Sequence, residues 1–196
     1  MSSLWGINKM EKLQLLKEQI LNCKRCDLRK TRTNPVIGEG SLDANIMFIG
    51  EAPGFNEDKQ GKPFVGQAGK IFDELLNSIN LKREKIYITN ILKCRPPNNR
   101  NPTQEEIKIC SSHLNKQIDI IKPKVICCLG NFATDYTLKK FGLKDKIQGI
   151  SKIHGQVFNT STLTGTIRII PLYHPAVVTY NPNMLKILKK DFEKTK

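Results

Sequence analysis

Residues 46–66 read IMFIGEAPGFNEDKQGKPFVG, and this is the most informative stretch of the chain. Its first four residues are an apolar run that predicts a short buried strand. The GEAPG segment at 50–54 then places two glycines and a proline within five positions, which predicts a tight turn. In open α/β sheets ligands bind at the carboxyl ends of the strands. Glu51, with Asp58 and Phe64 close behind it, therefore indicates a site for a planar polar ligand; an ordinary strand-to-loop turn is the alternative.

Three more apolar segments rich in β-branched residues predict further buried strands, at 86–91, 125–129 and 167–172. Helical patterns lie between and after the strands, at 67–79, 104–121, 131–140 and 182–194. This alternation predicts a three-layer α/β/α sandwich around a central, mostly parallel four-stranded sheet. We expect one domain over residues 1–196, with a hairpin or an irregular excursion at 142–166, where Gly, Ser and Thr are frequent.

The net charge of +14 is the strongest bulk property of the chain. A domain this basic attracts polyanions, most commonly nucleic acid, although a solvated lysine-rich surface is the alternative. Bases cluster at residues 24–32 and again at Lys93, Arg95 and Arg100, whereas residues 38–58 hold five acids and no base. This distribution suits a polyanion that binds along the basic rim while one of its units enters the acidic pocket and reacts there.

The N-terminal residues form an amphipathic helix pattern of mixed charge, unlike a signal peptide, and no apolar stretch is long enough to span a bilayer. These features predict a cytoplasmic protein, associated with the nucleoid if it binds DNA, with no membrane partner.

Four of the six cysteines have the placement of metal ligands. Cys23 and Cys26 form a Cys-x-x-Cys pair, Cys94 follows the second predicted strand, and Cys110 lies in the next helix. Four thiolates bind either zinc or an iron–sulfur cluster, and the spacing does not choose between them. The remaining pair, at 127–128, lies inside an apolar strand and is expected to belong to the core.

Polar side chains end three of the predicted strands. Glu51, Asn90 and His174 each follow an apolar run, so a parallel sheet would bring them to one edge. A carboxylate, a carboxamide and an imidazole form a plausible site for recognising a base and stabilising a leaving group. Asn90 can pair with a donor and an acceptor together, and Phe64 can stack on a base.

Taken together, these motifs resemble the family 4 uracil-DNA glycosylases, which carry an iron–sulfur cluster. The resemblance covers roughly residues 20–190. It rests on GEAPG at 50–54, GKPFVGQAG at 61–69, TNILKCRPPNNRNPT at 89–103 and His-Pro-Ala at 174–176. It implies that the four cysteines hold one structural 4Fe-4S cluster and that the chemistry needs no divalent metal.

The resemblance implies an enzyme that flips deoxyuridine out of DNA and hydrolyses its N-glycosidic bond, without a lyase step, at the start of base-excision repair. Uracil would be bound by Gly50, Glu51 and Ala52 of GEAPG, which is the first motif, by Phe64 of GKPFVGQAG, and by Asn90 and His174 at two predicted strand ends. His174 would stabilise the leaving anion. Glu51 is the first candidate to orient the water and Asp58 the second, and Glu57 is suggested to exclude thymine.

Arg95 and Arg100 belong to the second basic cluster, in a loop flanked by Cys94 and Cys110, and we expect them to contact the phosphates of DNA. After His-Pro-Ala this chain reads VVTYNPN where the family commonly has a Leu-Arg pair, so Val177, Val178 or Tyr180 would fill the gap in the base stack. We expect a monomer that acts on uracil-containing DNA, with a sliding clamp as a candidate protein partner. Two other hypotheses are a non-catalytic iron–sulfur module that binds DNA and a redox protein that uses its cluster as an electron carrier.

Overall fold

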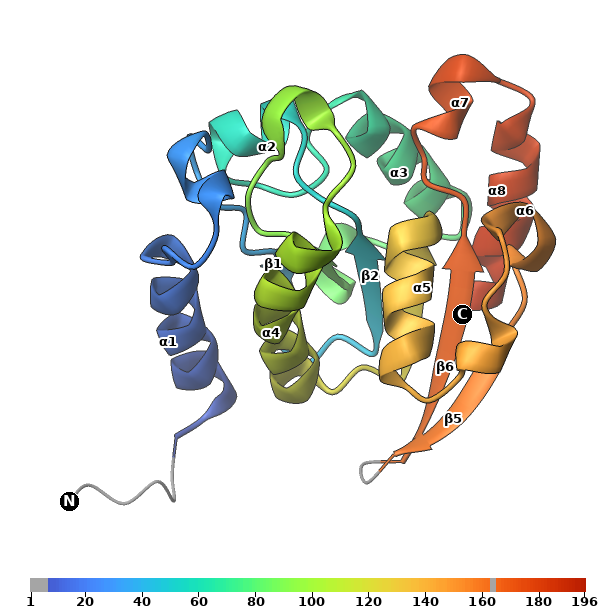
Figure 1. Ribbon diagram of the computed structural model, residues 1–196. Coiled ribbons are helices and arrows are strands. Elements are labelled where there is room, and N and C mark those ends of the chain that lie inside the picture. Colours follow the sequence, from blue (N-terminus) through green and yellow to red (C-terminus); the bar gives the residue numbers. More distant parts are fainter. Residues whose placement is uncertain (1–6, 163–164) are drawn as a thin grey trace.

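The computed structural model describes residues 7–162 and 165–196 (Figure 1). Its centre is a six-stranded sheet in the order β1-β3-β2-β4-β6-β5. The strands are β1 (Glu39–Gly40), β2 (Ile46–Gly50), β3 (Tyr87–Asn90), β4 (Val125–Leu129), β5 (Phe158–Thr162) and β6 (Gly165–Leu172). Within the described ranges, no helix is long and apolar enough to cross a membrane.

The four inner strands β3, β2, β4 and β6 are parallel, and they correspond to the four predicted strands. The sheet itself is wider than predicted, because β1 pairs antiparallel with β3 at one edge and β5 pairs antiparallel with β6 at the other. β1 is only two residues long, and β5 alternates half-buried and exposed side chains, so neither has the continuous apolar run of a buried strand. The α/β sandwich is confirmed, with a mixed sheet of six strands rather than four.

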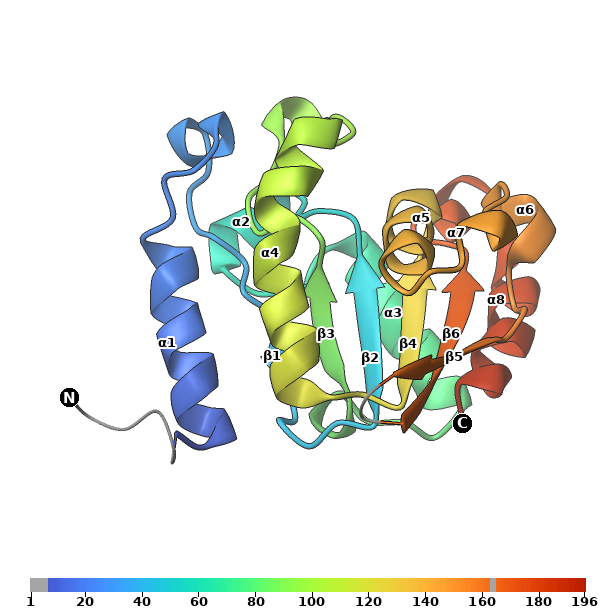
Figure 2. The ribbon, with the colours of Figure 1, turned by 60° about the horizontal axis from the view of Figure 1, so that its bottom comes forward.

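The helices form one layer on each face of the sheet (Figures 1 and 2). The α-helices are α1 (Lys9–Leu21), α2 (Phe55–Gln60), α3 (Gln67–Ser78), α4 (Gln104–Ile121), α5 (Asn131–Lys140), α6 (Ile150–Ile153), α7 (Val177–Tyr180) and α8 (Met184–Phe192). Short 3-10 helices are η1 (Asp27–Lys30), η2 (Arg83–Lys85), η3 (Pro97–Asn99), η4 (Lys144–Lys146) and η5 (Glu193–Thr195).

Side chains of the inner strands alternate between two separate apolar clusters. In β2, Met47 and Ile49 pack with α4 and α5, whereas Phe48 points to the opposite face and packs with α3 and α8. Helix α1 lies outside α4, away from the sheet (Figure 2). The two clusters fix the pleat of the sheet, and therefore the direction in which the residues at the strand ends project.

The four helices predicted from their patterns agree with α3, α4, α5 and α8, the last of which continues into η5. Thr103 and Glu106 form a capping box that sets the start of α4. The segment predicted as a hairpin or an irregular excursion contains η4, α6 and the β5–β6 pairing, and residues 163–164 within it lie outside the described ranges.

Candidate active site

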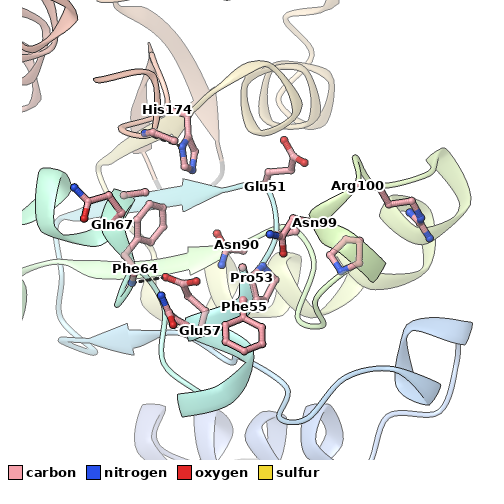
Figure 3. Close-up of a pocket in the computed structure, with 17 residues that line it drawn as sticks. Glu51, Pro53, Phe55, Glu57, Phe64, Gln67, Asn90, Asn99, Arg100 and His174 are labelled. Carbon is pink, nitrogen blue, oxygen red and sulfur yellow. Dashed lines mark hydrogen bonds between the residues drawn. The ribbon is translucent and has the colours of Figure 1, made fainter. Parts of the chain in front are cut away.

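A cavity of about 450 Å³ opens at the carboxyl end of the parallel strands (Figure 3). Its wall includes Glu51 after β2, Asn90 at the end of β3 and His174 after β6. These three side chains are far apart in sequence, and the parallel arrangement of the strands brings them to one edge of the sheet. Glu57 of α2, Phe64 of the loop that follows and Gln67 at the start of α3 complete this part of the wall.

Asn90 is buried, with 3% of its surface exposed, and its side chain borders the cavity. Among the described residues its carboxamide has no hydrogen-bonding partner, so the donor and the acceptor are both free for a ligand. Gly50 lies beside it in the parallel register. A Cβ at Gly50 would overlap Asn90 Oδ1 and lie 3.0 Å from the Phe64 ring, so glycine is needed for these two side chains to approach β2.

Phe64 has a backbone φ of 51°, a left-handed conformation that is unfavourable for a bulky residue. Its neighbours hold it there. Arg83 Nη2 donates to the Phe64 carbonyl at 2.6 Å, and Glu57 Oε1 accepts hydrogen bonds from the amides of Val65 and Gly66 at 2.9 and 2.8 Å. The Phe64 ring is thereby fixed against the cavity, 5.8 Å from the His174 ring and nearly parallel to it.

His174 has a defined tautomer. The Ala176 amide donates to Nδ1 of His174 at 3.2 Å, so Nδ1 is an acceptor and the ring proton of the neutral imidazole is on Nε2. Burial lowers the pKa of His174 to about 4, with Glu57 acting weakly in the opposite direction. The ring points toward the cavity (Figure 3), where it can offer a neutral N–H donor.

The two candidate carboxylates differ in their surroundings. Glu51 borders the cavity, and burial raises its pKa. Asp58 is buried elsewhere: its two oxygens accept from the amide of Thr33 at 2.9 and 3.0 Å. The structure therefore places Glu51 at the site and Asp58 in a contact that holds the 33–34 segment against α2. The sequence could not reveal this, because the partner of Asp58 is a backbone group 25 residues away.

Cys23, Cys26, Cys94 and Cys110 surround a second, small cavity, between the end of α1, the loop after β3 and α4. Nitrogen donors face two of the sulfurs: Arg32 Nη1 lies 3.1 Å from Cys94 Sγ, and the Lys93 amide lies 3.2 Å from Cys110 Sγ. Burial raises the pKa of both thiols, that of Cys110 to about 11. Over residues 7–162 and 165–196, no three potential ligands lie close enough to hold a single metal ion.

Four thiols around one cavity, with N–H donors aimed at the sulfurs, form a ligand set that fits an iron–sulfur cluster. The other two cysteines, Cys127 and Cys128, are fully buried in β4 and belong to the core as predicted.

Of the residues predicted to contact DNA, Arg100 borders the first cavity, and the others differ in their pairing and exposure. Arg100 is paired with Glu106 through two hydrogen bonds of 2.9 and 2.7 Å, whereas Arg95 carries no ion pair in the described part of the chain. Val177 and Val178 pack against the apolar cluster on the α3–α8 face. Tyr180, at the end of α7, is 89% exposed.

Lys93 does not belong to the basic rim, although its place in the sequence suggested so. It is 1% exposed, and its Nζ donates to Thr89 Oγ1, the Asn90 carbonyl and Gln117 Oε1 at 2.6–2.7 Å. Lys93 and Arg83 are the main residues that the sequence did not reveal. Both are polar residues that act on backbone carbonyls of the cavity wall, and no local motif indicates such contacts.

The chain is similar in sequence to proteins of a known family. Residues 37–195 match the family model described as the uracil DNA glycosylase superfamily. The chain belongs to this superfamily. It is 48% identical over 94% of its length to a type-4 uracil-DNA glycosylase of Sulfurisphaera tokodaii, covering 84% of that protein. It is 46% identical to the type-4 enzyme of Archaeoglobus fulgidus, with 94% of this chain and 92% of the relative covered.

A third type-4 uracil-DNA glycosylase, from Thermotoga maritima, is 42% identical over 95% of this chain and 94% of its own length. These relatives place the chain in the type-4 group and confirm the resemblance drawn from its motifs. The family model begins at residue 37, so it does not cover Cys23 and Cys26. The alignments with the type-4 proteins cover 94–95% of this chain, and they therefore include both cysteines.

Proposed function

We propose that this protein is a uracil-DNA glycosylase that hydrolyses the N-glycosidic bond of deoxyuridine in DNA and releases uracil. The observation that supports this most directly is the meeting of Asn90, Phe64 and His174 at one cavity, in a chain that belongs to the type-4 group. The substrate nucleotide would be flipped out of the DNA, because its glycosidic bond cannot be reached inside a base stack.

Uracil presents alternating acceptors and a donor along its pairing edge. The free carboxamide of Asn90 can meet a donor and an acceptor of this edge together, while the Phe64 ring stacks on the base. Gly50 allows both groups to approach, and the backbone of Glu51 and Ala52 borders the same space. Glu57 is held rigidly by two backbone amides, and we assign to it the exclusion of the thymine methyl group.

Bond cleavage leaves negative charge on uracil as the C1′–N1 bond breaks. The neutral Nε2–H of His174 would donate to the uracil oxygen on which this charge accumulates. Water adds to C1′, its proton is lost to solvent or to a nearby base, and uracil departs as an anion that is protonated afterwards. A single hydrolytic step of this kind involves no lyase chemistry and no divalent metal.

Glu51 is the group that we assign to orienting the water. It lies at the cavity, its pKa is raised by burial, and in its ionised form it can accept a hydrogen bond from the attacking water. Asp58 drops out of this role, because its carboxylate is occupied by the Thr33 amide.

Contact with DNA would use the surface around the cavity. Arg95 is the stronger candidate for a phosphate, since Arg100 is already paired with Glu106. At α7 the exposed Tyr180 is a better wedge for the gap in the base stack than Val177 or Val178, whose side chains are partly buried against the core. We further propose a monomer that works on chromosomal DNA in the cytoplasm, with a sliding clamp as a candidate partner.

The four cysteines would hold one 4Fe-4S cluster, which when bound acts as a structural cross-link and takes no part in hydrolysis. It would join the end of α1 to the loop that carries Arg95 and to α4. The N–H groups of Arg32 and Lys93 that face the sulfurs would stabilise the thiolate ligands.

The test is a glycosylase assay on a labelled oligonucleotide with one deoxyuridine, followed by hot alkali, without added divalent metal. Strands that carry thymine or cytosine at the same position are run as controls. We expect cleavage only at uracil. An intact strand in the presence of folded, brown, DNA-binding protein would contradict the proposal and favour a non-catalytic iron–sulfur module.

A further inference from the structure

Phe55 is an aromatic residue whose position the core does not explain. It is the first residue of α2, and 57% of its surface is exposed. It also borders the cavity, at the end away from His174 in the view of Figure 3. An exposed aromatic ring at the mouth of a cavity can bind a flat ligand.

Arg95 lies over this ring, with its guanidinium carbon 5.1 Å from the ring centroid. Its Nε donates to Asn99 Oδ1 at 2.7 Å, which fixes the plane of the guanidinium. In the described part of the chain this is the one hydrogen bond of the Arg95 side chain, so both terminal nitrogens remain available to a phosphate. The pair offers an aromatic ring with a cation fixed on it, at the edge of the cavity.

The size of the cavity also points to more than one bound ring. Its volume of about 450 Å³ lies within the range of roughly 300–1,000 Å³ typical of sites for ligands much larger than a pyrimidine. Asn90, Phe64 and His174 account for the inner part of the wall. Phe55, Asn99 and Arg100 border the remaining part of the cavity, which a single bound base would leave unfilled.

We propose that Phe55, supported by Arg95, forms a stacking platform for the nucleobase next to the excised uracil, with Arg95 contacting the intervening phosphate. This inference rests on the proposed function, which places a DNA strand across the cavity. Stacking on an aromatic ring is independent of base identity, since every base has a π-face. An unpaired neighbour gains most, because a neighbour inside a duplex is already stacked, so the platform favours single-stranded or frayed substrates.

The experiment measures stacking and affinity directly. An oligonucleotide carries a non-hydrolysable 2′-fluoro analogue of deoxyuridine, with the fluorescent base 2-aminopurine on its 5′ or its 3′ side. We expect quenching of 2-aminopurine on one of the two sides with the wild-type protein and with Phe55→Tyr, and loss of this quenching with Phe55→Ala. Affinity of Phe55→Ala for the single strand should fall on the order of 10- to 100-fold, and less for the duplex.

Met10→Ala provides the matched control, since Met10 is 69% exposed on α1, away from the cavity. It should bind both DNA forms like the wild type. Thermal melting of each variant shows whether the fold is kept. In single-turnover uracil release, Phe55→Ala should need more protein for half-maximal rate but reach nearly the same maximal rate.

Equal affinity and equal quenching for the wild type and Phe55→Ala would overturn the platform, and Phe55 and Arg95 would then be a surface pair only. This result is distinct from failure of the proposed function. If the wild type quenches 2-aminopurine but releases no uracil, the platform stands as a DNA-binding feature and the glycosylase proposal fails.

Discussion

Lowering the pH through 6.5 should leave the rate of uracil release nearly unchanged, although the proposed mechanism depends on a histidine. A free histidine has a pKa near 6.5, but burial lowers the pKa of His174 to about 4. The ring is then neutral throughout the physiological range, with Nε2 protonated because Nδ1 accepts from the Ala176 amide. It donates a hydrogen bond without having to gain a proton.

The magnitudes follow from these values. At pH 6.5 His174, with a pKa of about 4, is doubly protonated in only ~0.3% of molecules. Its titration would therefore change the rate of uracil release at this pH by too little to measure. Removing the donor should matter much more. His174→Ala deletes one preorganised hydrogen bond to developing charge, which typically costs about 10²–10³ in kcat. The acid limb of the profile should instead reflect Glu51, whose pKa is raised above its ordinary value.

The assay is single-turnover release of uracil from a labelled strand, between about pH 4.5 and 8.5, for the wild type, His174→Ala and Glu51→Gln. We expect a flat wild-type profile across pH 6.5 and a fall only at lower pH. Glu51→Gln should be slow and should lose this acid limb. A wild-type rate that changes with unit slope around pH 6.5, through a transition absent from His174→Ala, would refute a neutral donor.

The remaining predictions concern residues around the two cavities. Asp58→Ala should lower the free energy of unfolding by about 1–3 kcal/mol, because it removes the hydrogen bond between the buried Asp58 carboxylate and the Thr33 amide, while uracil release by the folded protein changes little; a large loss of kcat would restore Asp58 as a catalytic candidate. If Cys94 binds the proposed cluster, Cys94→Ala should remove the visible absorbance of the cluster and should lower the melting temperature and the DNA affinity more than the rate of the chemical step, whereas normal folding and DNA binding would exclude a structural role. Gly50→Ala should reduce uracil release up to about 100-fold by displacing the Asn90 carboxamide, with the melting temperature as control and unchanged kinetics as the contrary result.

The lowered pKa of His174 also affects stability. Below pH 6.5 His174 becomes protonated in the unfolded chain, whereas in the folded protein it stays neutral down to about pH 4. The free energy of unfolding therefore falls as the pH drops from 6.5 to 4. At pH 5 the difference between the two pKa values lowers the free energy of unfolding by at most about 2 kcal/mol. The loss is smaller in practice, because the His174 residue is only partly buried. Urea unfolding of the wild type and His174→Asn at pH 7 and pH 5 measures it: the wild type should lose more stability between the two.

The sequence predicted those parts of the fold that depend on local patterns. Continuous apolar runs such as 125–129 indicate strands buried on both faces, and β4 occupies this range. The edge strands β1 and β5 were not predicted, because Glu39–Gly40 is too short to show a pattern and residues 158–162 are largely polar. The convergence of Glu51, Asn90 and His174 was predictable, because the direction of parallel strands alone determines where their ends meet.

Contacts between a side chain and a distant backbone group could not be predicted. The left-handed conformation of Phe64 depends on Arg83 reaching its carbonyl, and neither residue carries a local signal of this contact. The surroundings of Asp58 could not be predicted for the same reason. Its position close to the first motif suggested chemistry, whereas the Thr33 amide, which comes from an earlier part of the chain, determines what its carboxylate does.

Lys93 connects the two cavities and explains why a cluster without a chemical role could still matter for catalysis. Its amide donates to Cys110 Sγ, and its buried Nζ donates to the carbonyl of Asn90 at 2.6 Å, so one residue contacts both a proposed cluster ligand and the strand end that presents the carboxamide. Gln117 of α4 accepts from the same Nζ. A buried amino group with three hydrogen-bonding partners is costly to disturb. Displacement of the loop after β3 would therefore move Asn90 as well, and a carboxamide misplaced by about 1 Å is enough to lose catalysis.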